Sequence, residues 1–158
     1  GLINFGLRWL GNPILLGSEL YDLNRWIASS SDGRFENLTL QAIFGYIFAP
    51  MAWLMGIQGG DILYVGTLLG EKIAVNEFVA YASLRDLQES LSQRSVIIST
   101  YALCGFANFA SIAMQIGAIG GIAPTRRSDV AELGLRAVAG GALASWMTAT
   151  IAGMLVAS

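Results

Sequence analysis

The sequence predicts an all-helical, polytopic membrane protein that contains a short re-entrant hairpin, a segment that enters the bilayer and turns back. Of its 158 residues, 54% are hydrophobic and 13% are charged, whereas soluble domains carry about a quarter charged residues. Its nineteen glycines are typical of membrane helices whose backbones pack closely. Glu77 lies between two apolar runs that are each too short to span a bilayer. A charge there is costly, so this carboxylate is a functional-site hypothesis.

Several kinds of function are excluded by composition. The net charge is -2, and the nine basic residues are scattered apart from one adjacent pair, so there is no basic stripe to bind a nucleic acid. Cys104 is the single cysteine and histidine is absent. The sequence therefore has no intrachain disulfide, no zinc-ligand spacing and no Cys/His or Ser/His nucleophile pair. Gly1 begins inside an apolar run without a signal sequence, which indicates the back part of a longer chain.

The first forty residues contain two predicted segments. Residues 1–17 are mostly apolar and are interpreted as the end of a transmembrane helix that emerges at the headgroups. Residues 18–37 are the longest polar stretch, with a turn-forming Ser-Ser-Ser-Asp-Gly sequence at 29–33. We expect this stretch to be an exposed polar loop.

Residues 38–57 admit two interpretations. The run follows Asn37, a plausible N-cap, and is long enough to span the bilayer, with Pro50 expected to kink it. Its interface-favouring side chains, Gln41, Tyr46 and Trp53, and the very short turn that follows favour instead a helix lying at the membrane interface. Sequence pattern alone leaves both open.

The next two segments are predicted to be interrupted. Residues 61–91 form the re-entrant hairpin, with arms at 61–74 and 78–91 and a return to the membrane surface at the polar residues 85–90. Residues 95–121 are long enough to span the bilayer, but a glycine and two polar residues interrupt them at 104–111. We expect a broken transmembrane helix, the form that transporters use around a substrate site near the midplane.

The last transmembrane helix is predicted at 129–157, after a sharp loop in which Ser128 and Asp129 are expected to cap it. Small residues at four-residue spacing indicate a face that packs tightly on a neighbouring helix; they are Ala137, Gly141, Ser145, Ala149 and Gly153. The Arg126-Arg127 pair predicts a cytoplasmic loop, with the C-terminus and the open end of the hairpin on the other side.

Five residues are candidates for binding chemistry or for an ion pair. Glu77 at the hairpin tip is read as functional, the alternative being a structural ion pair with Lys72. Asn108 and Ser111 are three residues apart on one helical face and suit a neutral, polyhydroxylated ligand, but interhelical hydrogen bonding explains them equally well. Phe106 could stack on a ring or simply pack. Lys72 and its neighbour Glu71 are expected to be solvated or to snorkel toward the interface; the tryptophans are expected to anchor at the interface or to pack.

Three ordered motifs carry a resemblance to a known family. They are NEFVAY at 76–81, ALCGFANFASI at 102–112 and IAPTRRSD at 122–129. In these the chain resembles the concentrative nucleoside transporters, from about residue 38 to the C-terminus. The resemblance implies that residues 38–158 are the family's second inverted repeat, that 38–57 is its interfacial helix, and that 1–17 ends a scaffold helix. The 18–37 stretch is longer than the family usually has there.

The resemblance also implies a function. Family members are homotrimeric symporters in the bilayer, in bacteria the inner membrane, that couple a sodium or proton gradient to nucleoside uptake. Glu77, Asn108 and Ser111 would hydrogen-bond the ribose and Phe106 would line the pocket, whereas the cation site and the base-reading residues belong to the first repeat. No cofactor and no metal site are expected in this part of the chain. The alternative is an intramembrane receptor or enzyme that uses Glu77 as ligand anchor or acid.

Overall fold

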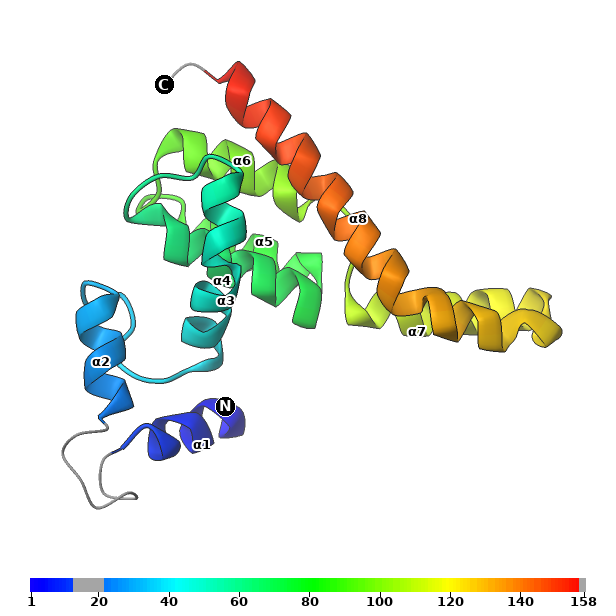
Figure 1. Cartoon of the computed structure of the whole chain (residues 1–158), viewed down its shortest axis with the longest axis horizontal. Coiled ribbons are helices and arrows are strands. Elements are labelled where there is room, and N and C mark those ends of the chain that lie inside the picture. Colours follow the sequence, from blue (N-terminus) through cyan, green and yellow to red (C-terminus); the bar gives the residue numbers. More distant parts are fainter. Residues whose placement is uncertain (13–21, 157–158) are drawn as a thin grey trace.

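The computed structural model describes residues 1–12 and 22–156, and all of their regular secondary structure is helical. The short helices α1 and α2 lie beside a central group formed by α3, α4, α5 and α6, and α7 extends away from that group together with one half of α8 (Figure 1). The helices are α1 (Leu2–Leu10), α2 (Leu23–Ser30), α3 (Leu40–Leu54), α4 (Asp61–Ala74), α5 (Glu77–Leu87), α6 (Gln93–Leu103), α7 (Phe109–Ile122) and α8 (Arg127–Leu155), with a 3-10 helix at Pro124–Arg126.

The polar stretch at 18–37 is not simply a loop, and this part of the prediction was wrong. Asp22 caps α2 by accepting a hydrogen bond from the Arg25 amide at 3.0 Å, and Ile27 is buried. One local cap and one buried apolar side chain stabilise a helix that a count of polar residues does not reveal. Residues 18–21 lie outside the described residues, as do 13–17 of the predicted scaffold helix.

Helices α3 and α4 pack with their backbones in contact. A Cβ atom at Gly66 would lie 2.5 Å from the carbonyl oxygen of Gly45, so no larger residue fits there. The Thr67 hydroxyl donates to the Gln41 carbonyl at 3.0 Å across the same interface. The cap of α3 is Thr39, which accepts from the Ala42 amide at 3.1 Å, rather than the expected Asn37.

The segment predicted as a hairpin is a packed pair of helices, α4 and α5, joined at Val75 and Asn76. Their shared apolar core extends to the end of α6 and consists of Leu68, Ala80, Leu84, Leu91 and Leu103. At the open end, Asp61 accepts hydrogen bonds from the amide and the hydroxyl of Ser92, at 3.1 and 2.8 Å. The pair is therefore fixed at its base as well as along its length.

Residues 104–108 separate α6 from α7, which places the interruption where the sequence predicts it. The turn at Gly105 passes so close to α8 that a Cβ atom there would lie 2.6 Å from the Ser145 hydroxyl. Ser145, Ala149 and Gly153 of the small-residue face are buried, and a Cβ atom at Gly153 would meet Ile98 of α6 at 2.7 Å. This part of the face packs on a neighbouring helix as predicted.

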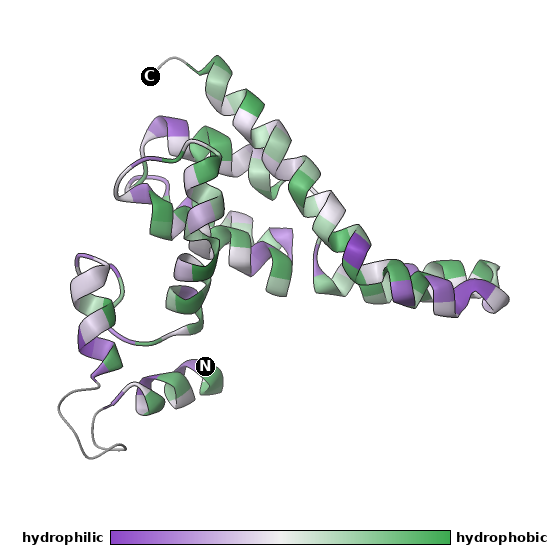
Figure 2. Ribbon diagram, in the orientation of Figure 1, coloured by the Kyte–Doolittle hydropathy of each residue, from purple (hydrophilic) through white to green (hydrophobic). Residues whose placement is uncertain are grey.

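One helical stretch among the described residues, Pro124–Leu155, is long and apolar enough to cross a membrane. Helix α8 starts at Arg127, before the residues Ser128 and Asp129 that were expected to cap it. Asp129 instead forms an ion pair with Arg126 at 2.6 Å. Figure 2 shows hydrophobic residues along much of α7 and α8. Many of these side chains are exposed, including Met147 and Leu155, which fits surroundings of lipid or of further protein.

Candidate functional site

Two helices, α5 and α7, each begin at an asparagine N-cap. The first cap lies at the tip of the α4–α5 hairpin and the second at the interruption between α6 and α7. The Asn76 side chain accepts from the Val79 amide at 3.0 Å at the start of α5. The Asn108 side chain accepts from the Ser111 amide at 2.8 Å at the start of α7. Each N-terminus carries a partial positive charge from the helix dipole. A buried acidic group beside them is therefore stabilised without a formal counter-charge.

The structure brings three predicted site residues into one hydrogen-bonded chain. The Asn108 amide nitrogen donates to the Glu77 carboxylate at 2.9 Å. The Asn108 amide oxygen accepts from the Ser111 hydroxyl at 3.0 Å. All three side chains are buried, with exposed fractions of 8%, 1% and 8% for Glu77, Asn108 and Ser111. Thirty-one residues separate Glu77 from Asn108, so their contact depends on the packing of the hairpin against the α6–α7 interruption.

This chain of bonds keeps spare hydrogen-bonding capacity. A carboxylate accepts at about four positions, and the structure uses one of those of Glu77. The Asn108 amide retains a second N–H, and the Ser111 hydroxyl oxygen can still accept. Acceptors and donors alternate over a short distance, which is the arrangement that neighbouring hydroxyl groups of a sugar require.

Phe106 lines a cavity next to Ser111 of the hydrogen-bonded residues. The cavity is about 730 Å³ and is formed by α7, α8 and the α6–α7 interruption; its lining includes Phe106, Ser111 and Gln115 among mostly apolar side chains. Small-molecule pockets occupy about 300–1,000 Å³. Phe106 is 69% exposed, so its ring is free to meet a ligand. Ser111 belongs both to the cavity and to the hydrogen-bonded chain.

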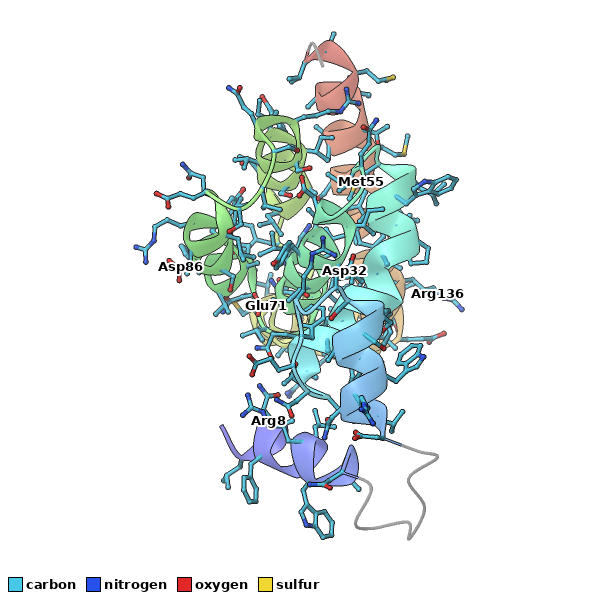
Figure 3. The ribbon with its side chains drawn as sticks, turned by 90° about the vertical axis from the view of Figure 1, so that its left-hand side faces the viewer. Arg8, Asp32, Met55, Glu71, Asp86 and Arg136 are labelled. Carbon is cyan, nitrogen blue, oxygen red and sulfur yellow. The ribbon has the colours of Figure 1, made fainter. Side chains whose placement is uncertain are left out.

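Glu71 and Lys72 are buried, and the expectation that they are solvated was wrong. Lys72 is completely buried and its ammonium donates to the Ala102 carbonyl at 2.9 Å. Glu71 is 7% exposed and lies within the packed helices, away from the outer edges where Asp86 and Arg136 lie (Figure 3). In the part of the chain that the structure describes, Glu71 and Lys72 form no ion pair with each other. Among the described residues, Glu77 and Lys72 do not form the alternative ion pair either.

Sequence reasoning missed the residues around Lys72. The Ser145 hydroxyl lies within hydrogen-bonding reach of the Cys104 carbonyl at 3.3 Å, and the Tyr81 hydroxyl donates to the Thr100 carbonyl at 2.8 Å. The signal in the sequence was a lysine in an apolar run that precedes a glycine-interrupted helix. No group of three or more metal-ligating side chains occurs within residues 1–12 and 22–156.

Residues 1–153 match the family model described as the C-terminus of Na+-dependent nucleoside transporters. The chain belongs to this family. It is the concentrative nucleoside transporter family that the three motifs indicate, and it is a family of transporters, not enzymes. The enzyme alternative for Glu77 is thereby removed.

Relatives from bacteria and mammals show the same relationship. An uncharacterized transporter of Haemophilus influenzae is 50% identical over 156 residues, covering 95% of this chain and 36% of that protein. The putative nucleoside permease NupX of Escherichia coli is 45% identical, over 77% of this chain and 30% of NupX. The mouse sodium/nucleoside cotransporter 1 is 39% identical, over 97% of this chain and 23% of the cotransporter.

The fold agrees with solved transporter structures. The transporter CNTnw in an inward-facing, substrate-bound state superimposes with a TM-score of 0.72 at 38% identity, covering 95% of this chain and 35% of CNTnw. An outward-facing variant of CNTnw superimposes equally well, with a TM-score of 0.72. The chain spans about a third of the length of its bacterial relatives.

Proposed function

We propose that this chain is the second repeat of a secondary-active, cation-coupled symporter that imports nucleosides by alternating access. The family supports a nucleoside as substrate. Within this polypeptide, the observation that carries the proposal is the buried hydrogen-bond network of Glu77, Asn108 and Ser111 at two helix N-termini. In this proposal the three side chains bind the ribose hydroxyls and Phe106 contacts the nucleoside from the cavity side.

The proposal assigns a membrane role to each segment. Helices α4 and α5 are the arms of a re-entrant hairpin, α6 and α7 are halves of a broken transmembrane helix, and α8 is the last span. Helix α3 lies at the interface, because it is shorter than the 20 or so residues that a span requires. The coupling cation binds in the other repeat, and the transporter is a homotrimer in the bacterial inner membrane.

The test is transport by the full-length protein in proteoliposomes. We expect an inward sodium gradient or an inward proton gradient to drive accumulation of unmodified radiolabelled uridine or adenosine above its external concentration, and dissipation of that gradient to abolish accumulation. Two arms, one for each cation, identify the coupling ion. Equilibration without accumulation in both arms would contradict symport.

Sugar hydroxyls should dominate recognition by this half of the site. Removing a recognised hydroxyl leaves buried polar groups unpaired, at a cost of about 1–3 kcal/mol per group. We therefore expect deoxynucleosides to compete more weakly than ribonucleosides for uptake, and free nucleobases more weakly still. Competition by nucleobases at ribonucleoside strength would show that Glu77, Asn108 and Ser111 do not read the sugar.

The orientation of the last helix follows from its basic end. Single cysteines at Arg126 and Val156, introduced with Cys104 replaced by serine, should react with a membrane-impermeant maleimide from opposite sides, the first from the cytoplasm. Right-side-out cells and inverted vesicles provide the two sides. Labelling of both positions from the same side would overturn α8 as a span.

A further inference from the structure

Helix α6 ends in carbonyl groups that donors from both α4 and α5 bind. The last four carbonyls of a helix have no amide partner within it. At the end of α6, Lys72 of α4 donates to the Ala102 carbonyl at 2.9 Å, and Tyr81 of α5 donates to the Thr100 carbonyl at 2.8 Å. The Ser145 hydroxyl of α8 donates to the Gly141 carbonyl of its own helix at 3.0 Å and lies 3.3 Å from the carbonyl of Cys104, which follows α6. Both arms of the hairpin are thus fastened to the same helix terminus.

The Lys72 contact differs from the others because its donor is a buried ammonium group. Its ammonium is completely buried, and it lies at the negative end of the α6 dipole, where a cation is stabilised. A buried charge is costly, and a charge-assisted hydrogen bond to a carbonyl compensates only part of that cost. A methionine would fill the same space without the cost. Packing alone therefore does not account for a lysine at this position.

The position of Lys72 relates it to the proposed nucleoside site. It lies five residues before Glu77, on the other arm of the hairpin. It also lies beside the interruption itself, because its nitrogen would be 3.8 Å from a Cβ atom at Gly105. Asn108 follows in the same interruption and meets Glu77 at 2.9 Å. The hydrogen bonds of Lys72 and of Glu77 therefore both join the α4–α5 hairpin to the region where α6 ends and α7 begins.

We propose that Lys72 is a positioning residue for the nucleoside site. Together with Tyr81 it holds the α4–α5 hairpin against the C-terminal end of α6, and this keeps Glu77 within hydrogen-bonding distance of Asn108. Lys72 itself does not touch the nucleoside. This inference rests on the proposed function, since it assumes that Glu77 and Asn108 bind the ribose.

The test is a double-mutant cycle in the full-length transporter, with uridine and adenosine affinity measured by calorimetry. Lys72→Met removes the charge and the donor, Tyr81→Phe removes one hydroxyl, and each is combined with Glu77→Gln. We expect Lys72→Met to weaken ribonucleoside binding by about tenfold or more and Tyr81→Phe by about two- to tenfold. In the Glu77→Gln background each should cost less than about twofold, because coupled residues are not additive. Lys72→Arg should restore part of the affinity.

Arg85→Met, which removes an exposed cation from α5, is the control and should bind like the wild type. Additive losses in the cycle, or unchanged affinity of Lys72→Met, would overturn the positioning role. If Lys72→Met does not fold, the Tyr81→Phe cycle decides by the same criterion, and additivity there overturns the proposal. If Glu77→Gln alone binds ribonucleosides normally, the assignment of the ribose site is wrong. If it binds them weakly and the cycle is additive, only the positioning role of Lys72 is wrong.

Discussion

Replacing Glu77 with glutamine is expected to weaken nucleoside binding by about 1.5–3 kcal/mol, the range for a hydrogen bond to a charged group. Glutamine keeps an oxygen that can accept from Asn108, as Glu77 does at 2.9 Å, so the hairpin tip should retain its packing. What is lost is the negative charge and one acceptor toward the ligand. Isothermal titration of the full-length transporter with a ribonucleoside measures this loss.

Glu89→Gln is the matched control, because it makes the same chemical change at an exposed carboxylate after α5. It should leave the affinity unchanged. An affinity of Glu77→Gln equal to that of Glu89→Gln would remove Glu77 from the ribose site.

Gly141→Leu is expected to abolish transport or to destabilise the protein by about 1–3 kcal/mol, the usual cost of overpacking. A Cβ atom at Gly141 would already lie 3.2 Å from the Cβ atom of Ala107, next to Asn108 in the α6–α7 interruption. The remaining atoms of a leucine would push the interruption away from α8. Uptake rates and thermal unfolding of the purified protein measure the two effects.

Gly140→Leu is the control on the adjacent position of the same helix, where a Cβ atom would meet no atom within 4 Å. It should transport like the wild type. Because Gly141 faces Ala107 of the α6–α7 interruption, folded Gly141→Leu protein should keep the trimeric state of the proposed transporter by size exclusion with light scattering. A folded monomer would instead place the small-residue face of α8 at the subunit interface.

The interruptions of both segments were predictable from the sequence because local chemistry determines them. Asn76 and Asn108 are capping residues followed by apolar helices, and Gly105 weakens the helix just before the second cap. The packing of Ser145, Ala149 and Gly153 of α8 was predictable for the same reason, since small residues at four-residue spacing allow helices to pack closely. These features need no knowledge of distant contacts.

The environment of Lys72 was not predictable, because it depends on contacts across thirty residues. A lysine in an apolar run suggests snorkelling unless the neighbouring helix happens to end beside it. Helix α2 was missed because its stability comes from one cap and one buried residue rather than from a periodic pattern. The Glu77–Asn108 hydrogen bond was also not predictable, because it is a long-range contact. Each residue was a candidate site residue, but their contact exists only in the packed structure.

The most direct test of the ribose site pairs a change in the protein with a change in the ligand. Affinities of the wild type and of Glu77→Gln are measured by calorimetry for uridine and for 2′,3′-dideoxyuridine. If Glu77 binds the sugar hydroxyls, the substitution weakens uridine binding by about tenfold or more and changes dideoxyuridine binding little. An equal loss for both ligands would contradict the account, because Glu77 would then act on the nucleoside without reading its hydroxyls.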